Sequence, residues 1–144
     1  MTGGTNYFSD SDERVEALSR AGGKVFIVAG GGSCRSHRSA FCGNHIPASK
    51  AKLDGPQDIA VDHAGNLLIA GDVVQRVDAK THQIEILAGN GKLPNAPVAR
   101  HRGESLPALT TAFEPWSLAV SPDSTIYIAD EMDGAVLAFH PGQA

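Results

Sequence analysis

Residues 53–72 read LDGPQDIAVDHAGNLLIAGD, and residues 113–130 read FEPWSLAVSPDSTIYIAD. Sliding the chain by 59 residues aligns the two stretches, apart from a one-residue adjustment near Asp54 and Gly55. Chance rarely keeps one register over about 40 residues, so the chain contains a duplicated unit. The aligned segments are 29–30 on 88–89, Pro56 on Pro115, 59–61 on 118–120, and 68–70 on 127–129.

Each unit predicts short strands that are separated by Gly, Pro, Asn and Asp, a spacing typical of antiparallel all-β structure. A segment rich in β-branched residues ends in glycine, and a long polar connection leads to a proline and three further strands. The expected strands are 24–29, 58–62, 67–70 and 73–78, then 82–88, 117–121, 126–129 and 135–140.

The expected strands do not alternate cleanly between apolar and polar residues. Residues 59–61, 67–70 and 118–120 are apolar at successive positions. Because successive side chains of a strand point to opposite faces, both faces of each sheet should be buried. A propeller blade, which packs between two neighbouring blades, has this environment. The pattern therefore favours a β-propeller over a sandwich whose sheets have one solvent-exposed face.

Both quoted stretches resemble NHL repeats, and the resemblance covers about residues 24–141. The chain departs from that pattern in its long connections before each proline and in Gly71, which stands where the family usually has Asp. The second copy keeps this residue as Asp130. The resemblance implies four-stranded blades, usually six to a ring, that work as a binding surface. A few relatives are enzymes, such as amidating lyases.

We therefore expect two four-stranded antiparallel blades in residues 24–144. The first segment, 24–29, corresponds to the outermost, fourth strand of a blade, and the last segment, 135–140, corresponds to the third strand. The final blade would lack its fourth strand, and segment 24–29 of another copy could supply it. Three copies would then give six blades, which predicts a homotrimer. A part of a longer propeller and a monomer with another all-β closure are the alternatives.

Residues 1–23 are expected to form an N-terminal extension. Within it, residues 9–22 read as a short helix, because acidic residues would lie in the first turn and glycines follow at 22 and 23. The extension has no cationic start and no apolar stretch of the kind that marks a signal peptide. This predicts a cytoplasmic protein that does not span a membrane.

The sharpest local pattern is Cys34, His37, Cys42 and His45, spaced C-x2-H-x4-C-x2-H. Four such ligands within a short loop could hold a structural zinc ion. The same two cysteines could instead form a Cys34–Cys42 disulfide in an oxidising compartment, or stay free. No other cofactor is expected.

Basic residues concentrate in the two long connections, whereas the whole chain has a net charge of −4. In a propeller these connections share one face with the turns that carry Asp72 and Asp130. That face could bind a protein or an anionic ligand. Trp116 and Gln57, which occupy equivalent repeat positions, should lie at its inner edge, where a tryptophan can anchor a partner or fill the space under its own loop. The basic candidates are Arg35, Arg38, Arg100, His101 and Arg102.

The sequence contains no nucleophile elbow, phosphate-binding glycine loop or His-Glu-x-x-His motif. The leading prediction is therefore a non-enzymatic binding or scaffold module. One alternative is a propeller lyase or hydrolase with a metal in its channel. Another is RNA binding through the basic loops, against which the low aromatic content of 6% argues.

Overall fold

The computed structural model describes residues 5–10, 12–19, 22–33, 44–91, 107–132 and 134–141. Over these ranges the protein is all-β, with antiparallel sheets and one short 3-10 turn, η1 (Ala48–Lys50). The strands are β1 (Asn6–Asp10), β2 (Arg14–Leu18), β3 (Val25–Ala29), β4 (Ile46–Pro47), β5 (Asp58–Val61), β6 (Leu67–Ala70), β7 (Val74–Val77), β8 (Gln83–Ala88), β9 (Pro115–Val120), β10 (Ile126–Asp130) and β11 (Ala135–Phe139).

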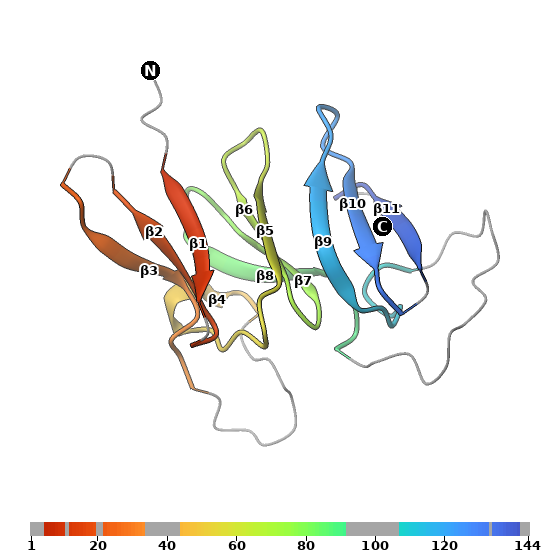
Figure 1. The fold of residues 1–144 in the computed structure, drawn as a ribbon, viewed down its shortest axis with the longest axis horizontal. Coiled ribbons are helices and arrows are strands. Elements are labelled where there is room, and N and C mark those ends of the chain that lie inside the picture. Colours follow the sequence, from red (N-terminus) through yellow and green to blue (C-terminus); the bar gives the residue numbers. More distant parts are fainter. Residues whose placement is uncertain are drawn as a thin grey trace.

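The strands form three sheets that lie side by side along the molecule, with β5 between β1 and β9 (Figure 1). The first sheet has the order β1-β2-β3, and the third has the order β11-β10-β9. The middle sheet has the order β4-β8-β7-β6-β5. We call these the first, middle and third sheets.

The middle sheet is buried on both faces, as its apolar sequence predicts. All four residues of β6 are buried, and they divide between two cores because neighbouring side chains point in opposite directions. Leu67 and Ile69 pack toward the first sheet with Val15 and Ala29. Leu68 and Ala70 pack toward the third sheet, whose contributions include Leu118, Ile126 and Ile128.

The short helix expected over residues 9–22 is wrong. Residues in this range belong to the hairpin of β1 and β2, and Val15 and Ala17 are fully buried. The burial of β2 alternates with the period of a strand, which the sequence interpretation missed. Its acidic residues do not start a helix, because Asp12 and Glu13 lie in the turn of the hairpin.

The repeat therefore extends into the residues that were expected to be an extension. Val15 pairs with Ala29, and Val74 pairs with Ala88 one 59-residue repeat later. Both strand pairs have an irregularity directly after the valine. The first sheet thus contains the counterparts of β7 and β8 as its strands β2 and β3.

The predicted homotrimer assumed that segment 24–29 of one copy completes a blade of another, and this assumption is wrong. The segment expected to complete a blade of another copy, β3, pairs with β2 of its own chain. The chain contributes to three sheets, not to two. The homotrimer itself stays a prediction. Within the part of the chain that the structure describes, no helix has the length and hydropathy that a bilayer crossing requires.

Candidate functional site

The candidate site lies at one end of the sheets, where the long connections enter β5 and β9 and where the turns after β6 and β10 lie. We call this end the loop rim. Asp58 at the start of β5 pairs with Ala70 at the end of β6, which brings the approach to β5 beside the following turn. The Gln57 amide donates to the Ala70 carbonyl oxygen at 2.7 Å, which fixes this approach.

Three carboxylates gather on the loop rim. Asp72 lies in the turn after β6, Asp54 precedes β5 and Glu114 precedes β9. Partial burial raises the pKa of Asp72 to about 6, and the charge of Asp54, a hydrogen bond with Asp54 and the charge of Glu114 add to the rise. Burial and the neighbouring acidic charges therefore favour the protonated form of Asp72.

Asp130, expected on the ligand-binding face, is buried in the structure. Its side chain is 2% exposed, and its Oδ1 accepts a hydrogen bond from the Glu114 amide at 3.3 Å. The Glu131 amide donates to the Glu114 carbonyl oxygen at 3.2 Å. These contacts hold the end of β10 against the segment that enters β9.

Gly71 occupies the place of Asp130 in the middle sheet, and its contacts explain the departure from the repeat pattern. A Cβ atom built on Gly71 would lie 2.6 Å from the Asp54 carbonyl oxygen. No side chain fits at that distance without moving backbone atoms. In the middle sheet, the backbone that leads into β5 therefore passes so close to the turn after β6 that residue 71 has no room for a side chain.

Trp116 and Gln57, at equivalent positions of the two repeats, both lie open to solvent at the loop rim. Trp116 is 51% exposed, and Gln57 is also exposed. This exposure leaves half of a large aromatic surface open at the entrance of β9. An exposed tryptophan of this kind can insert into a pocket on a binding partner.

Most residues of the other predicted sites lie outside the described ranges. His45 is described: its φ is 60°, and its amide donates to the Ile84 carbonyl oxygen at 2.7 Å. Among the described residues no group of three His, Cys, Asp or Glu side chains has metal-binding geometry. The zinc, disulfide and loop-binding hypotheses stay predictions. Their undescribed residues are Cys34, His37, Cys42, Arg35, Arg38, Arg100, His101 and Arg102.

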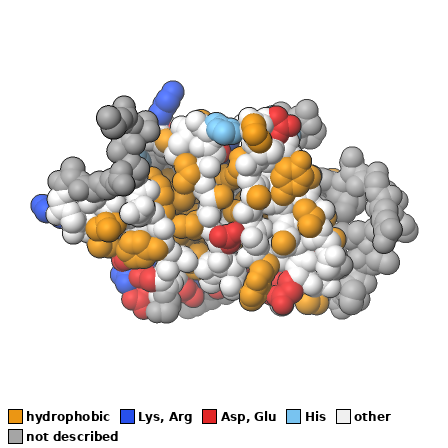
Figure 2. Space-filling view, turned by 45° about the horizontal axis from the view of Figure 1, so that its top comes forward, with side chains coloured by type: hydrophobic (Ala, Val, Ile, Leu, Met, Phe, Trp, Pro, Cys, Tyr) orange, Lys and Arg blue, Asp and Glu red, His pale blue; other side chains and the backbone are white. Residues whose placement is uncertain are grey.

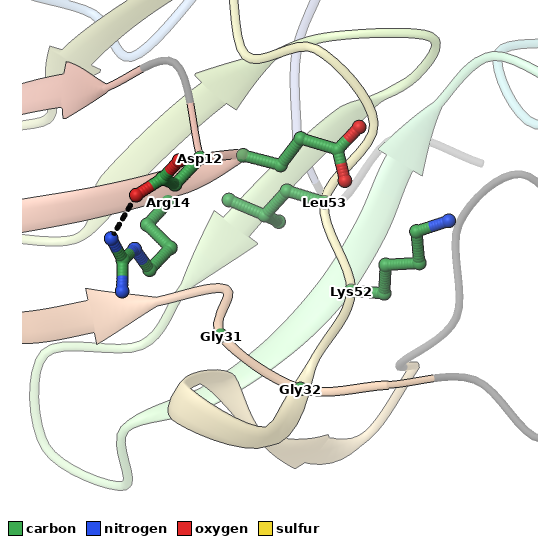
Figure 3. A pocket seen from close by; sticks show the side chains of 7 residues that line it. Asp12, Arg14, Gly31, Gly32, Lys52 and Leu53 are labelled. Atoms are coloured by element: carbon green, nitrogen blue, oxygen red, sulfur yellow. Dashed lines mark hydrogen bonds and ion pairs between the residues drawn. The ribbon is translucent and has the colours of Figure 1, made fainter.

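A pocket of about 300 Å³ opens between the first and middle sheets (Figure 3). The Arg14 guanidinium donates to Asp12, which also lines the pocket, at 2.6 Å and to Asp10 at 3.4 Å, so its charge is balanced by carboxylates of its own hairpin. The sequence interpretation missed this pocket because it placed residues 9–22 on a helix. The pocket is lined by Asp12, Glu13, Arg14, Gly31, Gly32, Lys52 and Leu53.

The chain is similar in sequence to teneurin-1. It is 29% identical to mouse teneurin-1 over 107 residues, which covers 72% of this chain and 4% of that protein. It is 28% identical to human teneurin-1 over 107 residues, again with 72% and 4% covered. The chain thus spans about 4% of the length of these relatives. No protein-family model matches it.

A solved structure shares the fold. It is a structural genomics protein of unknown function from Bacteroides thetaiotaomicron, with a TM-score of 0.68 and 18% sequence identity. The match covers 94% of this chain and 32% of that chain. The arrangement of all three sheets therefore recurs in a larger protein, and the likeness concerns the fold alone.

Proposed function

We propose that the chain is a non-enzymatic protein-binding module built from NHL-like propeller blades. The observation that carries this proposal is the stacking of three sheets through one 59-residue repeat, with the first strands of two repeats, β5 and β9, next to each other. Repeated sheets that stack face to face, with long connections at one end, are the organisation of a propeller. The similarity to teneurin-1 supports a scaffold role.

The loop rim is the proposed contact surface for the partner. Trp116 offers an exposed aromatic side chain two residues after Glu114, while Asp72 lies in the turn after β6 and Asp54 in the segment before β5. Aromatic residues dominate the binding energy of many protein interfaces, and charges around them set specificity. A basic or amphipathic segment of a partner protein fits this combination.

The test compares proteins that bind the immobilised chain and its Trp116→Ala variant, using quantitative mass spectrometry. Lys80→Ala is the matched control, because Lys80 is exposed in the turn between β7 and β8, away from the loop rim. We expect a partner that Lys80→Ala retains and Trp116→Ala loses. A purified partner should then shift the fluorescence of Trp116, the single tryptophan of the chain.

Retention of the same proteins by all three forms would contradict the proposal. So would a purified partner that binds without changing Trp116 fluorescence, because a rim-bound protein must cover that side chain.

A further inference from the structure

The pocket between the first and middle sheets differs in chemistry from much of the molecular surface. Hydrophobic side chains are spread over the face that Figure 2 shows, and charged side chains lie between them at a few places. The pocket is instead lined mainly by the charged residues Asp12, Glu13, Arg14 and Lys52. Its volume of about 300 Å³ lies at the lower end of the range for small-molecule sites.

The same place recurs between the middle and third sheets, one 59-residue repeat later. Gly30 directly follows β3, and Gly89 directly follows β8. A Cβ atom on Gly30 would lie 3.0 Å from the Arg14 Cα atom, and one on Gly89 would lie 3.2 Å from the Val73 Cα atom. Because the two copies are built alike here, the second copy shows what the fold itself requires at this place.

In the second copy, larger side chains occupy this place. Phe113 stands where the first copy has Leu53, since Phe113 Cζ would lie 3.4 Å from a Cβ atom on Gly89 and Leu53 Cδ1 would lie 3.3 Å from one on Gly30. Asn90 follows Gly89, whereas another glycine follows Gly30. The first copy therefore has more room than the fold requires.

Neutral residues stand in the second copy where the first pocket has its two cations. Val73 takes the place of Arg14, and Ala112, which precedes Phe113, takes the place of Lys52. Both copies nevertheless pack their sheets on each other through an apolar core. The fold therefore does not require a charge at either position.

Two charged groups of the pocket have no opposite charge beside them. Glu13 and Lys52 are both half-buried, and neither side chain has an ion pair or hydrogen bond with any residue that the structure describes. Drawing a charge partly out of water costs free energy unless an opposite charge compensates it. Glu13 also has a φ of 60°, a conformation that few residues with a side chain adopt. Both groups are therefore available to a ligand.

We propose that the pocket binds a small zwitterion of the amino-acid class, whose ammonium group pairs with Glu13 and whose carboxylate pairs with Lys52. A ligand with one charge would leave the other half-buried group without a partner. Figure 3 shows Lys52 on the opposite side of the pocket from Arg14, with Leu53 between them, so Lys52 lies apart from the Arg14 ion pair. The inference goes beyond the proposed function, because it concerns a small molecule and does not depend on binding at Trp116.

The experiment follows the backbone amide signals of the isotope-labelled chain by NMR while L-leucine or glycyl-L-leucine is added. The two probes hold their ammonium and carboxylate groups at different separations. At least one probe should shift the signals of residues 12–14, 31–32 and 52–53 in a saturable manner, with a Kd of about 1 mM or tighter. The N-acetyl and amide derivatives of that probe each lack one charge, and each should bind about tenfold more weakly or worse.

Glu13→Gln and Lys52→Met each remove one charge and keep a side chain of similar length. Both should weaken binding of the probe by about tenfold or more. Glu131→Gln and Lys50→Met are the matched controls, because Glu131 and Lys50 are exposed and lie outside the pocket. The controls should bind the probe like the wild type.

A second comparison separates a lost charge pair from a damaged pocket. Lys52→Met should bind the probe and its amide derivative with similar affinity, because the carboxylate has lost its partner. Glu13→Gln should likewise bind the probe and its N-acetyl derivative with similar affinity. A distorted pocket would weaken all these ligands alike and would not produce this pattern.

Absence of saturable shifts with both probes would overturn the proposal. So would shifts that lie away from the pocket, derivatives that bind as tightly as the unmodified probe, or pocket variants that bind like the wild type. A failure here leaves the Trp116 test unchanged, because the two experiments alter different residues.

Discussion

Asp58 and Ser117 occupy the same position in consecutive repeats, and they are hydrogen bonded to each other across two sheets. The Ser117 hydroxyl donates to Asp58 Oδ2 at 3.0 Å, and the Leu118 amide donates to the same oxygen at 2.8 Å. One carboxylate on β5 thereby holds the start of β9. The two residues differ in type because one accepts hydrogen bonds from the next sheet and the other donates them to the preceding sheet.

Asp58→Ala should lower the free energy of unfolding by about 1–3 kcal/mol, because the partly buried Leu118 amide loses its acceptor. Ser117→Ala removes one neutral donor and should cost about 1 kcal/mol or less. Urea unfolding of both variants measures the difference. Equal stability of Asp58→Ala and the wild type would show that the carboxylate does not join the sheets.

Gly32→Ala and Gly71→Ala should each lower the free energy of unfolding by about 1–3 kcal/mol or more. The added Cβ would lie 1.9 Å from the Lys50 carbonyl oxygen in the first case and 2.6 Å from the Asp54 carbonyl oxygen in the second. Gly22→Ala is the control, since nothing lies within 4 Å of its Cβ position, and it should change stability by less than about 0.5 kcal/mol. Thermal unfolding separates the three variants, and a Gly32→Ala protein as stable as Gly22→Ala would contradict the packing described.

Asp72→Asn should raise the melting temperature at neutral pH and leave it unchanged in acid. The folded-state pKa of Asp72 is about 6 against an ordinary 3.8, so the fold favours the protonated carboxyl. The stability that protonation gives is fully present below 3.8 and is lost as the pH rises through about 6. The difference between variant and wild type should therefore grow across this window.

Asp78→Asn provides a control of opposite sign for the pH experiment. Hydrogen bonds from the Thr81 and Lys80 amides lower the pKa of Asp78, so its ionised form is favoured in the fold. This variant should lose stability above the ordinary pKa of an aspartate, and the difference should disappear in acid. A loss of stability at neutral pH for Asp72→Asn would contradict the carboxylate cluster.

Ile128→Ala should cost about 2–5 kcal/mol, because Ile128 is 1% exposed in the core between the middle and third sheets. Leu109→Ala, at an exposed position, should change stability by less than about 0.5 kcal/mol. Urea denaturation of the two variants provides the measurement. Similar small effects would mean that the third sheet is not packed on the middle one.

Metal analysis tests the Cys34, His37, Cys42 and His45 motif directly. If these residues hold zinc, protein made with added zinc should retain about one ion per chain after dialysis in reducing buffer. A disulfide would instead give no zinc and a mass lower by two hydrogens that reduction restores. The Cys34→Ser variant is the control for either linkage.

Much of the fold could be predicted from local sequence. The continuous apolar run 67–70 predicted a strand buried on both faces, and β6 has that environment. The tight turn after Asp62 also follows from local chemistry, because Asp62 accepts hydrogen bonds from the Ala64 and Asn66 amides at 2.9 Å. The hairpin of β1 and β2 was missed because acidic residues favour the first turn of a helix as well as a hairpin turn.

The candidate site was less predictable. The repeat register predicted that Trp116 and Gln57 occupy equivalent positions, because it fixes where a strand begins, but it left open whether Trp116 is exposed or lies under its own loop. Both residues are exposed in the structure. The burial of Asp130 was not predicted, because it depends on the segment that enters β9 and donates a hydrogen bond to it. The three-carboxylate cluster joins Asp54 and Asp72 of one repeat to Glu114 of the next. No local sequence pattern predicts that these side chains meet.

The sequence by itself determined the 59-residue period, the strands of the two recognised repeats and their turns, because these features depend on side-chain periodicity and on hydrogen bonds between near neighbours. The tertiary structure alone decided that the N-terminal residues form two strands of the first sheet, that Gly71 must lack a side chain and that Asp58 reaches the next repeat. Those features depend on how closely whole sheets approach, and that distance is set by the combined packing of residues far apart in the chain.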